Sequence, residues 1–166
     1  MKDAIPKPRW WHSLVKKVAA TSFGSWLLAD NLHRIDRPFL HLSDGRTSLT
    51  GILAGLPVVI LTATGAKSGK PRSMPLAAIF DEDKIILIAS YLGKYRHPAW
   101  YHNLKANPKA RVKIHGEERD YIAHEAEGKE RERYWTQAVQ LYHGYENYRQ
   151  KASNRRIPVM VLTPEK

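Results

Sequence analysis

The chain has 166 residues, with 27 Lys and Arg against 16 Asp and Glu, and a formal charge of +11. Its length predicts one domain, and the absence of cysteine excludes disulfides, iron–sulfur clusters and a thiol nucleophile. The basic excess indicates an anionic ligand or partner, which composition cannot assign to phosphate, nucleic acid or acidic lipid.

The first third of the chain, residues 1–56, is predicted to hold an amphipathic helix over Trp10–Ala29 and a connecting segment. Two readings of this helix stay open. Its apolar stripe has the width of a helix that packs on a core, and its aromatic and lysine residues also suit a membrane interface with anionic headgroups. No secretory signal and no run of about 20 apolar residues is found, which favours a cytoplasmic protein. The apolar stripe is formed by Trp11, Leu14, Val15, Val18, Trp26 and Leu27.

The remainder, residues 57–166, alternates short apolar runs with tight turns and predicts one domain of about six strands. The predicted strands are Pro57–Thr62, Arg72–Phe80, Lys84–Ser90, Ala110–His115, Arg119–His124 and Ile157–Leu162. Helices are predicted at Pro98–Ala106, Glu130–Tyr142 and Tyr145–Lys151. Connections too short for a crossover make successive strands antiparallel. We therefore expect an α+β fold, with the sheet as a meander closed into a small barrel and the helices packed at its ends.

Two segments carry cations without any acid. Residues 91–115 hold Lys94, Arg96, Lys105, Lys109, Arg111 and Lys113, and the turn after the first strand holds Lys67, Lys70 and Arg72. Together with Trp100 and Tyr101, the cations of these two segments could bind a phosphorylated ligand that has an aromatic part. A solvated basic surface is the alternative.

Several kinds of catalytic site are not supported by the residue spacing. The turn Gly65–Lys70 has three residues between its glycines and is followed by Pro71, so it is not a phosphate-binding P-loop. His97 and His102 stand five apart with no acid between them, so no metal site is expected. No sequence pattern supplies a protein nucleophile.

Aromatic residues mark two further places. At the start of the predicted helix 98–106, Trp100 is expected as a core anchor, whereas Asn103 could meet a planar ligand. Tyr142, Tyr145 and Tyr148 recur every three residues. Such a stripe either packs in the core or overhangs a pocket.

Three stretches together resemble one known family. They are TATGAKSGKPRSMPLAAIF (62–80), IASYLGKYRHPAWYHNLKANPKARV (88–112) and YWTQAVQLYHGYENYRQKASNRRIPVMVL (134–162). In order and spacing, these stretches resemble the deazaflavin-dependent nitroreductase family. The resemblance implies a split β-barrel that binds the deazaflavin coenzyme F420 and transfers a hydride from its reduced form to a small planar or lipophilic acceptor, such as a quinone, enone or nitro compound.

The resemblance also implies the site residues. Lys67, Ser68 and Arg72 would bind the anionic tail of the cofactor, and Met74, Pro75 and Ala77 would line its ring system. Ser90, Tyr91, Gly93 and Lys94 follow the third strand, where Ser90 would lie near the reacting edge and Lys94 would contact the phosphate. Ala99, Trp100 and Asn103 would form the helix start against the deazaflavin. Tyr145 and Tyr148 would close over the acceptor, with Tyr145 as candidate proton donor. The chain departs from many members by Tyr91-Leu92-Gly93 in place of Lys-Gly-Gly, and by Ala77 in place of an aromatic residue.

Two other functions remain as alternatives. An FMN-binding split-barrel oxidoreductase would use the same architecture and the same cations. A basic module that binds nucleic acid or a lipid surface would use the charge alone. With the deazaflavin enzyme as first choice, we expect a small-molecule acceptor, no nucleic acid, a possible peripheral contact with anionic membrane, and a monomer or weak homodimer.

Overall fold

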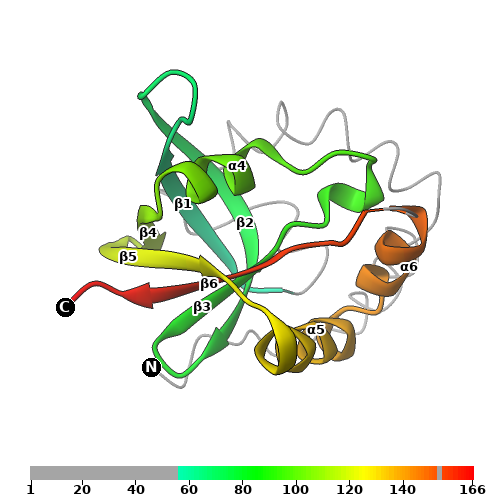
Figure 1. Ribbon diagram of the computed structural model, residues 1–166. Helices are drawn as coiled ribbons and strands as arrows, with labels where there is room; N and C mark the ends of the chain where they lie inside the picture. The colour runs from blue at the N-terminus through cyan, green and yellow to red at the C-terminus, as the bar shows by residue number, and fades with distance from the viewer. Residues whose placement is uncertain (1–55, 153–154) are drawn as a thin grey trace.

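The computed structural model describes residues 56–152 and 155–166, which form a six-stranded barrel with three α-helices (Figure 1). The strands are β1 (Val58–Thr64), β2 (Pro71–Asp81), β3 (Lys84–Ile88), β4 (Lys109–Ile114), β5 (Glu117–Glu125) and β6 (Val159–Pro164). The helices are α4 (Ala99–Ala106), α5 (Gly128–Leu141) and α6 (Gly144–Lys151), with a short 3-10 turn, η1 (Tyr91–Gly93), after β3. The elements predicted between residues 57 and 166 are confirmed, with ends that differ by at most two residues.

The barrel closes in the order β1-β2-β3-β6-β5-β4, and every neighbouring pair is antiparallel. The predicted meander is wrong beyond β3, because β6 lies between β3 and β5 while β4 pairs with β1. The helices α5 and α6 between β5 and β6 give the chain the length to reach this place. Closure also removes the exposed strand edges that an open meander would leave.

Side chains alternate between the barrel interior and its outer surface. In β1, Val59, Leu61 and Ala63 are buried while their neighbours are half-buried, so this strand is fully covered on one face and not on both as predicted. The interior cluster also takes in Trp100 and Leu104 from α4. The helix α4 therefore closes one side of the barrel with its apolar face.

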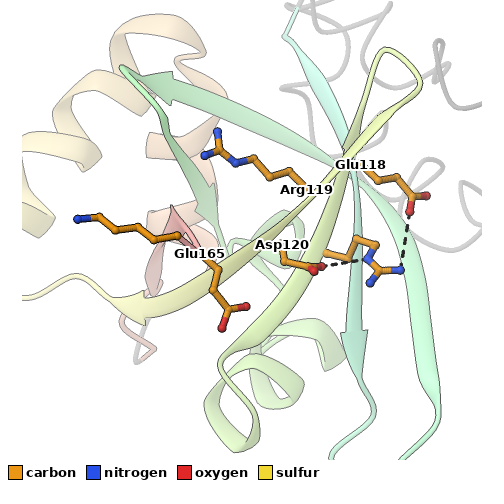
Figure 2. A pocket seen from close by; sticks show the side chains of 6 residues that line it. Glu118, Arg119, Asp120 and Glu165 are labelled. Atoms are coloured by element: carbon orange, nitrogen blue, oxygen red, sulfur yellow. Dashed lines mark hydrogen bonds and ion pairs between the residues drawn. The ribbon is translucent and has the colours of Figure 1, made fainter.

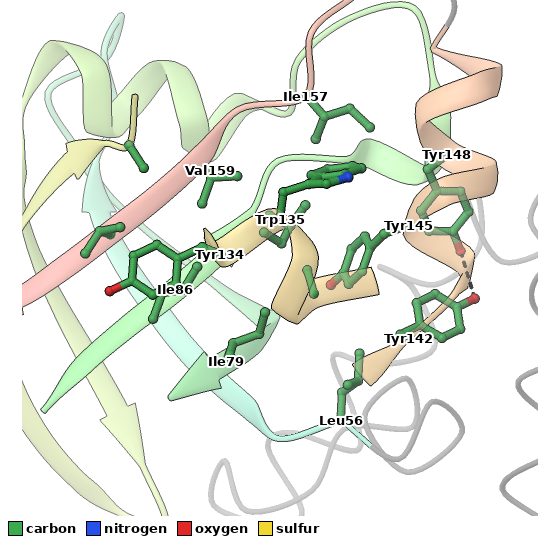
Figure 3. Packing of buried hydrophobic residues seen from close by; sticks show 14 of the residues in the cluster. Leu56, Ile79, Ile86, Tyr134, Trp135, Tyr142, Tyr145, Tyr148, Ile157 and Val159 are labelled. Carbon is green, nitrogen blue, oxygen red and sulfur yellow. Dashed lines mark hydrogen bonds between the residues drawn. The ribbon is translucent and has the colours of Figure 1, made fainter. Parts of the chain in front are cut away.

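A second apolar cluster lies outside the barrel, where α5 and α6 cover β2 and β3 (Figures 1 and 3). Tyr134 fixes α5 in place, because its hydroxyl donates to Asp81 Oδ2 at 2.8 Å at the end of β2. Arg133 donates to both carboxylate oxygens of Asp81, at 3.1 and 3.0 Å. The segment between β3 and α4 runs out to α6 before it returns to the barrel (Figure 1).

The predicted helix Trp10–Ala29 and the connecting segment up to residue 55 lie outside the described residues. Within the described part of the chain, every helix is too short or too polar to span a membrane.

Candidate functional site

The turn between β1 and β2, residues 65–70, is shaped by its own backbone. The Gly65 amide donates to Lys70 O at 2.9 Å, and the Gly69 amide donates to Gly65 O at 2.8 Å. Gly69 has a φ of +65°, in the left-handed region that glycine adopts at little cost. Lys67 and Ser68 lie exposed at the tip of this turn.

The cations of this turn remain available to a ligand. Within the part of the chain that the structure describes, no carboxylate pairs with Lys67, Lys70 or Arg72, and all three are exposed. They form the basic turn, residues 65–72. A cluster of unpaired exposed cations raises the local concentration of anions, so the basic turn can hold an anionic group.

The other predicted basic segment, residues 91–115, is different. Three of its cations form ion pairs with carboxylates of β5 and of the C-terminus, residues that lie outside this segment of the sequence. The nitrogen-to-oxygen distances are 3.1 Å for Lys105–Glu125, 2.6 Å for Lys109–Glu165 and 3.0 Å for Arg111–Asp120. The prediction that this whole segment grips an anion is therefore wrong for these three residues.

A hydrogen bond joins the basic turn to the middle of α4. The Ala66 amide donates to Asn103 Oδ1 at 3.0 Å. Pro98 precedes the helix and Ala99 is its exposed first residue. The structure thus brings Asn103 against the turn that carries Lys67 and Ser68, two distant segments that the resemblance assigned to one site.

Trp100 takes a different position from its helix neighbours. Its side chain is 5% exposed and packs in the barrel interior. This burial supports the core-anchor alternative for Trp100. Asn103, one turn away from Ala99, is the side chain of this helix that faces the basic turn.

The predicted ring-lining residues of β2 do not share a face. Met74 packs against the barrel interior, whereas Ala77 packs against the outer cluster with α5 and α6. Pro75 shares the face of Ala77, because strand side chains alternate with a period of two. A ring lying on one face of β2 can therefore contact Pro75 and Ala77, or Met74, but not all three side chains at once.

The turn after β3 has an unusual backbone. Tyr91, Leu92 and Gly93 have consecutive positive φ angles of 47°, 56° and 78°. Ser90 is 7% exposed, and its carbonyl accepts from the Gly93 amide at 3.0 Å. The Lys94 ammonium lies 5.1 Å from the centre of the Tyr91 ring, within cation–π range.

The tyrosines of α6 lie in the outer cluster (Figure 3). Tyr145 and Tyr148 are 6% and 4% exposed, and their ring centres lie 6.2 Å apart. The Tyr142 and Tyr148 hydroxyls share a hydrogen bond of 3.2 Å. Burial raises the pKa of Tyr145 and of Tyr148 well above the usual range, so both hydroxyls keep their protons at neutral pH.

One residue near the site was missed by the sequence reasoning. Arg155 donates to the carbonyls of Ala89, Ser90 and Lys94 and lies 2.9 Å from His97 Nδ1. Burial, followed by the charge of Arg155, lowers the pKa of His97, which favours its neutral form. No local signal marks Arg155, because it is one of two arginines beside a predicted strand and its partners lie about 60 residues earlier.

A hollow of about 500 Å³ lies elsewhere, over β4, β5 and the C-terminus (Figure 2). It is lined by Arg111, Glu118, Arg119, Asp120, Glu165 and Lys166. Arg111 belongs to the predicted basic segment 91–115, and the other five are not predicted site residues. Within it, Arg111 forms ion pairs with Asp120 at 3.0 Å and with Glu118 at 4.0 Å. A shallow hollow whose lining residues are all charged offers little to an apolar acceptor, so we place the candidate site at the basic turn, α4 and η1 instead.

A metal site is not apparent in residues 56–152 and 155–166. No group of three or more His, Cys, Asp or Glu side chains there is arranged to hold an ion.

Comparisons with known proteins show which family this chain resembles. A Mycobacterium tuberculosis protein named provisionally as an F420H2-dependent quinone reductase, Rv3178, is 35% identical over 114 residues, which cover 69% of this chain and 95% of that protein. The F420H2-dependent quinone reductase Rv1261c of the same organism is 37% identical over 111 residues, 64% of this chain and 73% of that protein.

Two solved structures share the fold at substantial identity. An F420-H2 dependent reductase (FDR-A) has 43% identity and a TM-score of 0.59, over 64% of this chain and 93% of its own. A structure described as a domain-swapped dimer has 36% identity and a TM-score of 0.61, over 85% of this chain and 99% of its own. The family model for F420H2-dependent quinone reductase matches residues 33–164. The chain therefore belongs to the F420H2-dependent quinone reductase family.

Proposed function

We propose that this protein is an oxidoreductase that reduces a quinone with coenzyme F420 in its reduced form. The single observation that carries the proposal is the hydrogen bond from the Ala66 amide to Asn103 Oδ1. It holds the basic turn, whose exposed cations have no carboxylate partner among the described residues, against α4. A ligand with an anionic tail and a planar head could bind across these two elements. The family match supports the same reading.

The residues present fit such a ligand chemically. Lys67, Ser68 and Arg72 offer two cations and a hydroxyl to an anionic tail, without a carboxylate of their own to saturate them. Ala99 and Asn103 border the tail site at the start of α4. We assign the ring system to the outer face of β2, where Pro75 and Ala77 lie, with Met74 and Trp100 supporting that wall from the barrel interior.

The turn Tyr91–Gly93 and Lys94 complete the cofactor site on the side of β3. Lys94 carries the charge that a phosphate needs, and the left-handed backbone sets its direction. Bound reduced F420 supplies the hydride, so the protein need only bind it, orient it and admit an acceptor.

The acceptor side is assigned to Ser90, Tyr145 and Tyr148. The rings of both tyrosines belong to an apolar cluster, which suits a lipophilic planar molecule better than a charged one. The Tyr145 hydroxyl carries a proton at neutral pH, and it is the group proposed to donate that proton to the reduced acceptor.

A contact with the membrane surface would bring the site to a lipophilic quinone. Tyr95 is 83% exposed between Lys94 and Arg96, an aromatic residue with flanking cations as found at membrane interfaces. We propose a cytoplasmic protein with this peripheral contact, as a monomer or weak homodimer. Co-sedimentation with vesicles of anionic lipid, compared between the chain and its Tyr95→Ser variant, tests the contact. Equal sedimentation of both would remove Tyr95 from the proposal.

Titration with cofactors tests the function. Under anaerobic conditions, the chain should bind reduced F420 more tightly than FMN, and a water-soluble quinone should then restore the oxidised deazaflavin absorbance. Tighter binding of FMN would favour the FMN-dependent alternative. Binding of F420 without quinone turnover, but with reduction of an enone or nitro compound, would keep the cofactor and change the acceptor.

A further inference from the structure

The turn after β3 holds a backbone conformation that its residues do not favour. Tyr91 and Leu92 carry side chains at φ angles of 47° and 56°, and Gly93 follows at 78°. The left-handed region is unfavourable for a residue with a Cβ. Such conformations persist where surrounding contacts determine them, so this turn needs a support.

Arg155 supplies that support from the segment between α6 and β6. Its Nη1 donates to Ala89 O at 3.2 Å, its Nη2 to Ser90 O at 2.7 Å and its Nε to Lys94 O at 3.1 Å. Two of these carbonyls precede the turn and one follows it. A single planar guanidinium therefore ties both ends of the turn together across its base.

A further contact extends this clamp to the approach of α4. Arg155 Nη1 lies 2.9 Å from His97 Nδ1. Because a guanidinium only donates, His97 Nδ1 is the acceptor and the imidazole carries its proton on Nε2. Four of the five guanidinium N–H donors are thereby directed at the chain's own atoms.

The helix α6 holds the same turn from the other side. Gly93 is buried against it, and a Cβ at Gly93 would lie 3.0 Å from Tyr148 O and 2.7 Å from the Lys151 Cβ. The turn thus lies between α6 and Arg155, and its shape depends on both. The strand β6, which follows Arg155, does not require these bonds for its own pairing with β3 and β5.

We propose that Arg155 is a positioning residue for the cofactor site, holding residues 89–97 in the shape that binds reduced F420 without touching the cofactor itself. This inference rests on the proposed function, in which Tyr91, Gly93 and Lys94 contact the cofactor. Its donors are committed to the backbone and to His97, so its effect on the ligand passes through the position of the turn.

Two substitutions at Arg155 and one control test the proposal. Arg155→Ala removes every bond of the clamp, and Arg155→Lys keeps the charge but loses the planar fork that reaches both ends of the turn. Arg156→Ala removes the same charge from the neighbouring exposed residue. Each variant is compared with the unaltered chain by titration with reduced F420 and by amide hydrogen exchange without any ligand.

The expected results differ between the variants. A shifted turn loses the contact of Lys94 with the cofactor, and one hydrogen bond to a charged group corresponds to about tenfold to a hundredfold in affinity, so Arg155→Ala should weaken F420 binding by roughly this factor. Arg155→Lys should fall between this variant and the unaltered chain, and Arg156→Ala should stay within about twofold. The amides of Gly93 and Lys94 donate to Ser90 O and Tyr91 O. In the hydrogen-exchange measurement, both amides should lose protection in Arg155→Ala, while the amides of the barrel strands keep theirs.

Two results would overturn the proposal. The first is unchanged F420 affinity in a folded Arg155→Ala or Arg155→Lys variant. The second is an equal loss of affinity in Arg156→Ala, which would mean that charge alone matters. If Arg155→Ala does not fold, the F420 affinity of Arg155→Lys is compared instead, both with that of the unaltered chain and with that of Arg156→Ala. If the unaltered chain does not bind F420, the proposed function fails together with the ligand part of this inference, and hydrogen exchange still shows whether Arg155 holds the turn.

Discussion

Replacing Asn103 by alanine should separate cofactor binding from stability. Asn103→Ala removes the acceptor of the Ala66 amide, a hydrogen bond of 3.0 Å between α4 and the basic turn. Its loss costs about 0.5–1.5 kcal/mol of unfolding free energy. Alanine in a helix interior returns up to about 0.7 kcal/mol through its higher helix propensity. The two effects nearly cancel, so the melting temperature should change by no more than about 3 °C.

The gain in helix propensity does not offset the effect of Asn103→Ala on the affinity for reduced F420. Once the basic turn is released from α4, the cofactor must order it again on binding, at a cost of the same size as the lost hydrogen bond. Since 1.4 kcal/mol corresponds to a factor of ten, we expect binding to weaken by up to about tenfold. Faster hydrogen exchange at the Ala66 amide would report the released turn directly.

Asn107 gives a matched control. Its Oδ1 also accepts a backbone amide, that of Lys109 at 3.1 Å, but this bond joins the end of α4 to β4 and does not hold the basic turn. Asn107→Ala gains nothing from helix propensity at that capping position. It should therefore lose about 1 kcal/mol and roughly 2–4 °C, with unchanged cofactor affinity. The reasoning is refuted if Asn107→Ala weakens binding as much as Asn103→Ala, or if neither affects it.

Three further predictions concern single side chains. Arg72→Glu should weaken F420 binding by roughly tenfold to 150-fold, as for a lost bond between charged groups, whereas Lys129→Glu, the same charge change on exposed α5, should leave it unaltered in a fluorescence titration. Tyr145→Phe should lower quinone turnover, or change acceptor preference, at constant cofactor affinity; a lower melting temperature with full turnover would instead make the ring a core residue. Tyr134→Phe should lower the unfolding free energy by about 1 kcal/mol through loss of the bond to Asp81 and leave turnover intact. Burial and this bond raise the pKa of Tyr134 from 10.0 to about 12, so its contribution is present below pH 10 and lost as the pH rises through 12. The unfolding free energy of Tyr134→Phe, measured by denaturant titration, should therefore lack this decrease at alkaline pH. An equal decrease in the variant and in the unaltered chain would contradict the role given to the Tyr134 hydroxyl.

The sequence by itself determined the kinds and limits of the elements between residues 57 and 166. Strand alternation, turn residues and helical spacing are local properties, and each acts within a few residues of the chain. The compound motif at residues 62–80 and 88–112 likewise identified the cofactor class, because order and spacing within a motif are written along the chain. The basic turn could be found for the same reason, since its three cations lie within six residues.

Only the tertiary structure decided which distant segments meet. The place of β6 between β3 and β5 depends on how α5 and α6 pack outside the barrel, and no local pattern records that choice. The pairing of Arg111 with Asp120 arises from the β4–β5 register, and it removes a cation from the predicted anion site. Arg155 meets its carbonyl partners across more than 60 residues, because α6 returns the chain to the turn after β3. A contact of this kind is created by closure of the fold, and so it cannot be read from the residues beside it.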